Sequence, residues 1–514
     1  MNHSNRKTRC ERRVYHFCCC AVLLLLMSVP STSQANKRVT DLTLEGLNLA
    51  YNFELDKAES KFNEAIQVEP SHPRPFVGKA TVLFWRFALG NDDKLYEELL
   101  SHADRAIEVA EEYIDNNEKD SDALTCLGSL YGYKAFAHAR QRSYFKAAWD
   151  GKKSLDYFSD AVEANPKAYD AYLGLGCYHY FASFAPKSLQ WVISILGADG
   201  NPDLGVRELK LAVQKGTYTS IEAQYYLAQF LPWQSGNFNV SESLLVDLNK
   251  RFPKNALVAF TLAVWEMRRN AVGSAQPRLQ EIVQADRGFV PGLKAISLYK
   301  LAECNFRKHK FQDAIKEYDA FLSVFDDEHY RATAHFRIGI SYEMLGQRAQ
   351  AVKHYQAARA EERRHGDDRY SARKAEILIK APMSGVDSLL MCAKNAFKTG
   401  AYNTAKELYK KLDSLQSISP SLRAEARFGI GEILIEQEAF AEALPYFNSV
   451  LTINVGEEFW LIPWSHYQLG FCHSKLGNST VARHEFEAVQ DYDENYDFKN
   501  WLGFRTEREL ERLK

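Results

Sequence analysis

Hydrophobic and polar positions in this chain recur with a period of about 34 residues, and each period holds two helix-length segments. Over residues 41–70, Gly46 is followed twelve residues later by Ala58, then by Phe62, Ala65 and Pro70. Apolar residues three or four apart are typical of amphipathic helices, so each period predicts a pair of helices joined by a turn. The same spacing returns at Ala263/Ala275/Leu279/Ile282, Ala302/Ala314/Tyr318/Phe321, Gly339/Ala351/Tyr355/Ala358, Ala393/Ala405/Tyr409/Leu412, Gly431/Ala443/Phe447/Val450 and Gly470/Ala482/Phe486/Val489.

This order of small, small, aromatic and apolar residues is that of the tetratricopeptide repeat. Bulky side chains at the small positions would push the helix axes beyond the usual separation of about 8–10 Å. Each helix pair leaves one apolar face open, so neighbouring pairs must stack. The sequence therefore predicts an all-α, right-handed helical solenoid of about eleven helix pairs with a C-terminal capping helix in residues 495–514.

The spacing also predicts how the chain is divided. Two repeats are lengthened, which indicates inserts near residues 136–150 and 186–202. We expect the first insert to lengthen both helices of its repeat. The predicted parts are a signal peptide at 1–35, an N-terminal solenoid at 36–360, a connector at 361–386, and C-terminal repeats with the cap at 387–514.

The N-terminal residues have the order of a secretory signal peptide. Five basic residues between Arg6 and Arg13 precede an apolar run from Phe17 to Pro30, and Ser33 and Ala35 supply small residues for cleavage after Ala35. We therefore expect export, to a periplasm or out of the cell. The alternative is an uncleaved N-terminal membrane anchor, although the run is shorter than the ~20 residues that a spanning helix needs.

Charge and cysteine content exclude several classes of function. Cleavage would leave 59 basic and 65 acidic residues, so no basic surplus favours nucleic acid or an anionic membrane surface. The five cysteines that follow the signal peptide are widely spaced and odd in number, which does not suit a disulfide framework. We expect them to be small buried hydrophobic residues, and none has metal-ligand spacing: Cys126, Cys177, Cys304, Cys392 and Cys472.

Several longer motifs are not general features of the repeat. They are FKAAWDGKKSLDYF, FAPKSLQWVISILGADGNPDLGVREL, RYSARKA and FWLIPWSHYQLGFCHSKLG with YDFKNWLGFR. Over about residues 120–514 the chain resembles the family of inclusion-body clearance proteins and tetratricopeptide repeat protein 39. The resemblance implies a helical repeat fold and no catalytic residues. Those eukaryotic relatives are intracellular, whereas this chain carries an export signal.

First helices line the concave face of such a solenoid, so the inward positions can be counted from each repeat's first small residue. Positions two, five, nine and twelve give an aromatic face that could hold a peptide. The candidate groove residues are Tyr180, Tyr226, Phe230, Trp233, Phe260, Met267, Tyr467 and Phe471. The alternative is that a tight superhelix buries these side chains against the 186–202 insert. The groove lacks the Lys/Asn/Arg arrangement by which such repeats clamp a chaperone's C-terminal carboxylate.

The apolar insert itself has two interpretations. Residues 187–200 could make a peripheral contact with a membrane or a partner, but they hold one basic residue, Lys187, and are short for membrane insertion. Packing inside the solenoid is the favoured interpretation, because an exposed run of this kind promotes aggregation.

Catalysis has little support in the sequence. His309, His335, His354 and His365 have no partners at suitable spacing, and no motif for a nucleophile, a phosphate loop or a metal site occurs. The inward carboxylates Glu303, Glu343 and Glu432 could in principle act as a hydrolase pair across the groove. We expect instead a non-enzymatic scaffold or adaptor that binds a protein or peptide, with no cofactor and no nucleic acid. A structural subunit of an envelope assembly is a further alternative.

Overall fold

The computed structural model describes residues 32–90, 93–183, 200–235, 238–285, 291–325, 329–361 and 366–513. These residues form 24 α-helices and, in the described ranges, no strand. The chain divides into two compact units, Met1–Asn255 and Ala256–Lys514. Most of the predicted signal peptide and of the 186–202 insert lies outside the described residues.

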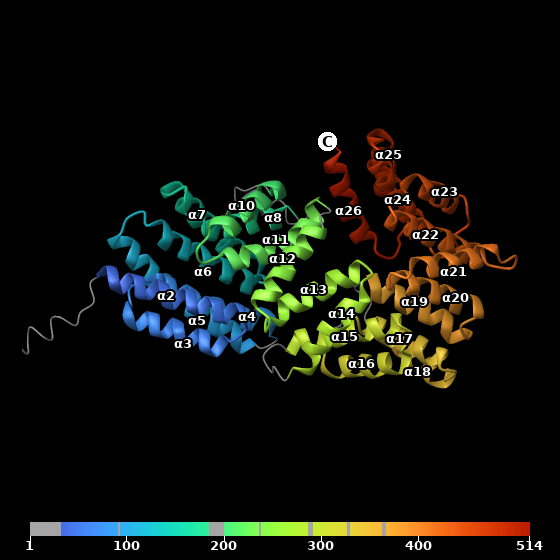
Figure 1. Ribbon diagram of the computed structural model, residues 1–514, viewed down its shortest axis with the longest axis horizontal. Coiled ribbons are helices and arrows are strands. Elements are labelled where there is room, and N and C mark those ends of the chain that lie inside the picture. The colour runs from blue at the N-terminus through green and yellow to red at the C-terminus, as the bar shows by residue number, and fades with distance from the viewer. Residues whose placement is uncertain are drawn as a thin grey trace, which may run out of the picture. The chain divides into compact units, whose positions relative to one another are not determined.

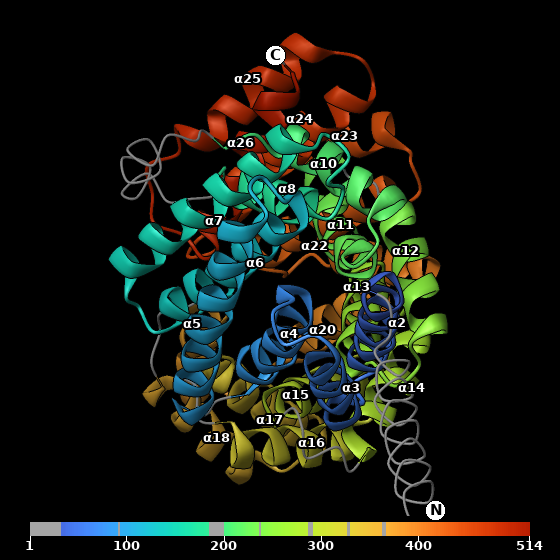
Figure 2. The same ribbon diagram turned by 90° about the vertical axis from the view of Figure 1, so that its left-hand side faces the viewer.

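The N-terminal unit contains the helices α2 to α12, and consecutive helices pack against one another (Figures 1 and 2). Their bounds are α2 Thr32–Tyr51, α3 Leu55–Val68, α4 Pro73–Leu89, α5 Asp93–Asn116, α6 Ser121–Arg140, α7 Tyr144–Ala164, α8 Ala171–Ala182, α10 Pro202–Lys215, α11 Ser220–Ser235 and α12 Phe238–Arg251. At 20 and 21 residues, α6 and α7 exceed the 14 residues of α3. The first helix α2 also has 20 residues, so α7 is longer than its counterpart α3, whereas α6 is no longer than α2. That the first insert lengthens both helices of its repeat stays a prediction.

The C-terminal unit continues the same arrangement from α13 to α26 (Figure 1). Its helices are α13 Ala256–Arg268, α14 Val272–Gln284, α15 Pro291–Arg307, α16 Phe311–Val324, α17 Arg331–Met344, α18 Arg348–Ala360, α19 Gly366–Lys380, α20 Gly385–Lys398, α21 Tyr402–Ser414, α22 Pro420–Glu436, α23 Phe440–Leu451, α24 Leu461–Lys475, α25 Ser479–Gln490 and α26 Lys499–Arg512. Residues 366–380 of the predicted connector form α19, and the predicted C-terminal cap contains α26.

Aromatic side chains and glycines join neighbouring helix pairs. The Phe62 ring on α3 lies against Gly46 on α2 and Gly78 on α4. A Cβ at Gly46 or Gly78 would come within 2.6 or 2.3 Å of that ring, so a larger residue at either site would displace the helices. The ring of Tyr409 meets Gly429 of the following repeat in the same way. Small residues at the repeat positions thus make room for the aromatic that bridges two repeats.

The turns within helix pairs share one backbone conformation. At each of eight turns the second residue after the first helix has a positive φ, which is 57–60° for the non-glycine residues and 73–79° for the glycines. The next N–H donates to the carbonyl five residues earlier, as from Lys310 to Asn305 at 2.9 Å, which is the Schellman arrangement. These positive-φ residues are Phe53, Arg142, Asn270, His309, Gly346, Gly400, Glu438 and Gly477.

The described cysteines are free thiols, and Cys126, Cys304 and Cys472 are buried. Cys177 and Cys392 are half-buried. None of the described helices is long and apolar enough to cross a membrane.

Candidate functional site

Three of the predicted groove residues come together in the N-terminal unit. The rings of Tyr180 on α8 and Phe230 on α11 stack with centroids 3.7 Å apart, and both residues are buried. The Tyr180 hydroxyl donates to the Phe230 carbonyl oxygen at 3.2 Å. Tyr226 is half-buried, with its ring 5.9 Å from that of Phe230. Of the three rings, that of Tyr226 is the one that is not buried.

The other predicted groove residues do not join this cluster. In the C-terminal unit, Phe260 is half-buried and packs with the buried Met267. Tyr467 is buried beneath the Arg505 guanidinium, 4.8 Å from the ring centre, and Phe471 is half-buried. Trp233 belongs to α11, but its side chain lies outside the described part of the chain.

A buried carboxyl group in the N-terminal unit has no counterpart among the sequence predictions. Glu222 on α11 is 7% exposed. Burial raises its pKa to about 7, while a hydrogen bond from Trp85 acts in the opposite direction. Its charge also helps to raise the pKa of Tyr51, Tyr133 and Tyr226, so these aromatic groups lie around it.

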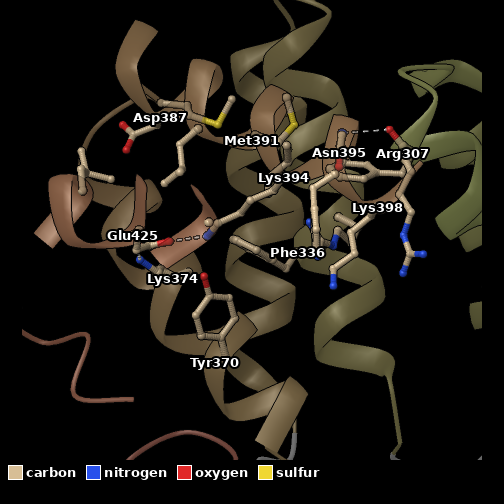
Figure 3. Close-up of a pocket in the computed structure, with 18 of the residues that line it drawn as sticks. Arg307, Phe336, Tyr370, Lys374, Asp387, Met391, Lys394, Asn395, Lys398 and Glu425 are labelled. Carbon is tan, nitrogen blue, oxygen red and sulfur yellow. Dashed lines mark hydrogen bonds and ion pairs between the residues drawn. The ribbon is translucent and has the colours of Figure 1, made fainter. Parts of the chain in front are cut away.

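The C-terminal unit holds a cavity of about 390 Å³, which Figure 3 shows in close-up. Most of its wall comes from the first helices of successive repeats, α15, α17, α20 and α22, and from α19. Its volume suits several side chains of a bound segment. The apolar part of the wall includes Phe306, Phe336, Ile340, Leu390, Met391, Phe397, Phe428 and Trp460.

One end of the cavity is held together by paired charges. Lys394 on α20 contacts the Glu425 carboxylate on α22 (Figure 3). Lys374 on α19 lies 2.7 Å from Glu458. Arg373 binds Glu458 at 2.9 Å and Asp497 at 2.7 Å. Burial alone would raise the pKa of Glu458, but the contacts with Arg373 and Lys374 lower it to about 2. These cations are already neutralised and are poor anchors for a ligand.

Two other cations in the wall have no carboxylate within ion-pairing distance among the described residues. The Arg337 guanidinium on α17 lies 4.7 Å from the centre of the Phe306 ring, and the Lys398 ammonium on α20 lies 4.8 Å from that of Phe397. Contacts of this kind leave the positive charge available. Figure 3 shows Lys398 and Arg307 projecting in the same direction from α20 and α15. The cavity therefore combines apolar walls with two cations, Arg337 and Lys398, that form no ion pair with a described residue.

The three inward carboxylates differ in their surroundings. Glu303 accepts from Lys300 at 2.7 Å and from Arg307 at 3.3 Å. Burial would raise the pKa of Glu303, but Lys300 and Arg307 lower it to about 2. Glu343 contacts Arg348 and accepts from the Met383 amide at 2.6 Å. In the described ranges no hydrogen bond joins any two of these carboxylates.

Glu432, in contrast, lines the cavity without an ion pair to any described residue. Burial raises its pKa, against the opposing effect of the nearby Lys398. Among the described residues no hydrogen bond to the Glu432 carboxyl group is present.

The predicted histidines also lack a catalytic arrangement. The Nδ1 atoms of His335 and His354 lie 3.3 Å apart, and burial lowers the pKa of His335 to about 4. His309 stacks on Phe311, with ring centres 5.6 Å apart. His365 lies outside the described residues. No group of three or more His, Cys, Asp or Glu side chains in the described part of the chain is arranged to hold a metal ion.

The sequence analysis did not predict this cavity, although its rule for inward positions identifies several of the residues that line it. With Ala393 as position eight, positions two, five, nine and twelve are Asp387, Leu390, Lys394 and Phe397, and all four line the cavity. The repeat around Gly431 contributes Glu425, Phe428 and Glu432 in the same way. The sequence analysis selected repeats whose inward positions are aromatic, and these two repeats have mostly aliphatic or charged residues at those positions. Arg337 and Lys398 fall between these positions, so the rule gives no signal for them.

Comparison with known proteins supports the repeat assignment. Residues 170–380 match the model of the Iml2/Tetratricopeptide repeat protein 39 family, and residues 390–456 match a tetratricopeptide repeat model. No curated protein matches the chain. The fold assignment rests on these family models and on the helices themselves.

Several solved structures are similar at low identity. Yeast Tom70 is 11% identical to this chain, with 89% of this chain and 100% of that chain covered and a TM-score of 0.29. Pseudomonas aeruginosa pilF is 12% identical, with 45% and 89% covered and a TM-score of 0.33. A tetratricopeptide repeat protein from Parabacteroides merdae is 15% identical, with 56% and 99% covered and a TM-score of 0.25.

Proposed function

We propose that this tetratricopeptide repeat protein, which resembles the Iml2/Tetratricopeptide repeat protein 39 family, is a non-enzymatic scaffold that binds a segment of another protein in the cavity of its C-terminal unit. Tetratricopeptide repeats are typical protein-interaction modules, since their stacked first helices present an extended concave surface. The observation that carries the proposal is the cavity's chemistry, with apolar walls beside the unpaired cations Arg337 and Lys398.

The same chemistry limits the segment that can bind. Apolar side chains would fill the space between Phe336, Met391 and Phe428, where water gains few hydrogen bonds. An aspartate or glutamate nearby would supply the charge that Arg337 and Lys398 lack. We therefore expect an acidic segment with at least one large apolar side chain.

Selection from a random peptide library on the full chain tests this proposal. We expect the enriched peptides to combine Asp or Glu with Leu, Ile or Phe. The double substitution Arg337→Gln and Lys398→Gln should weaken a selected peptide by at least about tenfold, because each charge-assisted contact contributes about 1.5–3 kcal/mol. The matched control is Lys410→Gln, an exposed lysine on the second helix α21. Equal binding by the double variant and the control would contradict the proposal.

The half-buried aromatics Tyr226, Phe260 and Phe471 form a second part of the proposal, as further contacts for the partner. Their exposed edges combine apolar area with little loss of side-chain entropy on binding. Tyr226→Ala should weaken the binding of a longer partner segment without changing the peptide that the C-terminal cavity selects. Unchanged affinity for every partner segment would remove Tyr226 from the site.

Export remains a proposal that rests on residues 1–35. Their order of basic, apolar and small residues supports recognition by a secretory pathway. Mass spectrometry of the protein purified from its host would test the idea. A mature chain that begins at Asn36 supports cleaved export, whereas a chain that retains residues 1–35 supports the membrane-anchor alternative or no export.

A further inference from the structure

The turn between α6 and α7 exposes three large aromatic side chains. Phe145 is 85% exposed, Trp149 59% and Tyr144 57%. Phe145 and Trp149 stand four residues apart on α7, so they share one face of the helix. In Figure 2, α7 lies at the edge of the N-terminal unit. Aromatic side chains gathered in this way on a surface mark an interaction site more often than singly exposed ones.

These aromatics are not needed to hold α7 in place. Other side chains of the helix carry the packing contacts: Asp150 lies 3.3 Å from His138, and the Ser154 hydroxyl donates to the Gly128 carbonyl at 2.7 Å. Farther along, Phe158 packs between Gly128 and Gly174. The exposed face therefore gives no evident stability to the fold.

Unpaired positive charge surrounds the aromatics. Arg142 and Lys146 are exposed, and no carboxylate among the described residues lies within ion-pairing distance of either. The nearest acidic groups of α7 along the chain are engaged, because Asp150 faces His138 and Asp156 contacts Lys152, while Asp160 and Glu163 lie toward the other end of the helix. The surface formed by Arg142, Tyr144, Phe145, Lys146 and Trp149 is thus locally cationic although the whole chain has a net charge of −2.

We propose that this surface, the α7 face, docks the protein on an anionic lipid bilayer. Tryptophan, tyrosine and phenylalanine rings suit the boundary between headgroups and acyl chains, where an apolar body and a polar edge are both satisfied. Arginine and lysine next to them would contact lipid phosphates, with their stems along the apolar region. Charge complementarity therefore selects an anionic bilayer over a neutral one. The residues of the α7 face differ from those of the expected 187–200 contact and from those that line the C-terminal cavity.

Co-sedimentation of the full chain with vesicles tests the inference. One set contains phosphatidylcholine alone, and the other contains two parts phosphatidylcholine to one part phosphatidylserine. We expect sedimentation with the second set only, decreasing as salt rises because headgroup attraction is screened. Arg142→Gln with Lys146→Gln should lower the affinity by roughly 25-fold, from about fivefold for each lost charge. Phe145→Ser with Trp149→Ser should lower it by at least about tenfold.

A matched control separates the α7 face from exposed aromatics in general. Phe459 is 41% exposed in the C-terminal unit, and Phe459→Ser should leave vesicle binding unchanged. The inference is overturned if neutral vesicles bind equally well, or if both double variants sediment like the wild type. It is also overturned if the wild type ignores vesicles but self-associates in sedimentation velocity and the aromatic variant is monomeric, since the face would then be a protein interface.

Discussion

Two glutamates on first helices, one in each unit, differ sharply in their protonation. Glu222 in the N-terminal unit is surrounded by aromatic groups, and burial raises its pKa to about 7. Glu303 in the C-terminal unit is also shielded from water, but Lys300 at 2.7 Å and Arg307 at 3.3 Å lower its pKa to about 2. The repeat pattern fixes where the helices run in both units. The charges around each inward side chain decide what its surface can bind.

The difference extends to the surfaces around these carboxyl groups. In the N-terminal unit the predicted groove residues Tyr180 and Phe230 are stacked and buried, so much of the aromatic area is used in packing. In the C-terminal unit the first helices border an open volume with free cations at Arg337 and Lys398. A conserved plan of helix packing thus supports a closed aromatic cluster in one region and a cationic cavity in the other.

The largest expected change in the free energy of unfolding tests whether both units depend on the same aromatic packing position. Phe62 and Phe447 occupy the same repeat position in the two units, and each is fully buried. Phe62→Ala and Phe447→Ala should each lower the free energy of unfolding by about 3–5 kcal/mol, through lost burial and a residual cavity. Urea unfolding with hydrogen exchange, to follow each unit, measures both losses. Phe459→Ala, at a 41% exposed site, is the control and should change little.

A loss confined to one of the two phenylalanine variants would break the comparison. It would mean that the helices of one unit relax around the missing ring. The buried phenylalanine would then contribute less to the stability of that unit than its counterpart does to the other.

The substitution Glu222→Gln should give a smaller effect that depends on pH. A carboxyl group whose pKa is about 7 when folded and near 4.3 when unfolded binds its proton more tightly in the folded state. The wild type therefore loses stability as pH rises from about 4 through 7, by roughly 3 kcal/mol in all. The variant should match the wild type at acidic pH and exceed it at pH values above 7. Urea midpoints measured across this range would refute the assignment if the two proteins stayed parallel.

The substitution Glu303→Gln should show the opposite pH dependence. Because the folded pKa of Glu303 is about 2, the folded state favours the carboxylate, and its contribution is present at neutral pH. That contribution is lost as pH falls below about 4.3 towards 2, and after allowance for the pair's partial exposure we expect about 2 kcal/mol. The control is Glu487→Gln, which removes an exposed carboxylate on α25. Equal pH profiles for Glu303→Gln and the control would show that Lys300 and Arg307 do not hold Glu303 strongly.

The sequence was sufficient to predict the helical repeats because their constraint is local. Gly46, Phe62 and Gly78 follow the repeat spacing, and the structure places the ring between the two glycines. The cavity is different, because it depends on which charges find partners. Arg373 and Asp497 are 124 residues apart, yet their ion pair closes part of the C-terminal network. No spacing rule links such residues. Arg337 and Lys398 can therefore be identified as cations without an ion pair only from a structure that shows which other cations are paired.

The turns within helix pairs allow the smallest test of the two regions. The N-terminal unit uses Arg142 at a positive φ of 57°, whereas the C-terminal unit uses Gly477 at 79°. A Cβ at Gly477 would meet no atom within 4 Å, so Gly477→Ala isolates the backbone cost, about 1 kcal/mol of lost stability. Arg142→Gly should relieve a similar strain, but the glycine gains entropy in the unfolded chain, which leaves a gain of at most about 0.5 kcal/mol.

Gly273 supplies the control for this last prediction. It lies within α14, away from positive φ, and a Cβ there would also meet no atom within 4 Å. Gly273→Ala should therefore raise stability, by up to about 1 kcal/mol, since alanine favours the helix. Thermal unfolding of the three variants measures the signs directly. A shift of stability in the same direction for Gly477→Ala and Gly273→Ala would contradict the prediction. Side-chain contacts, rather than backbone conformation, would then govern these turns. The two units would differ for a reason other than their residues at positive φ.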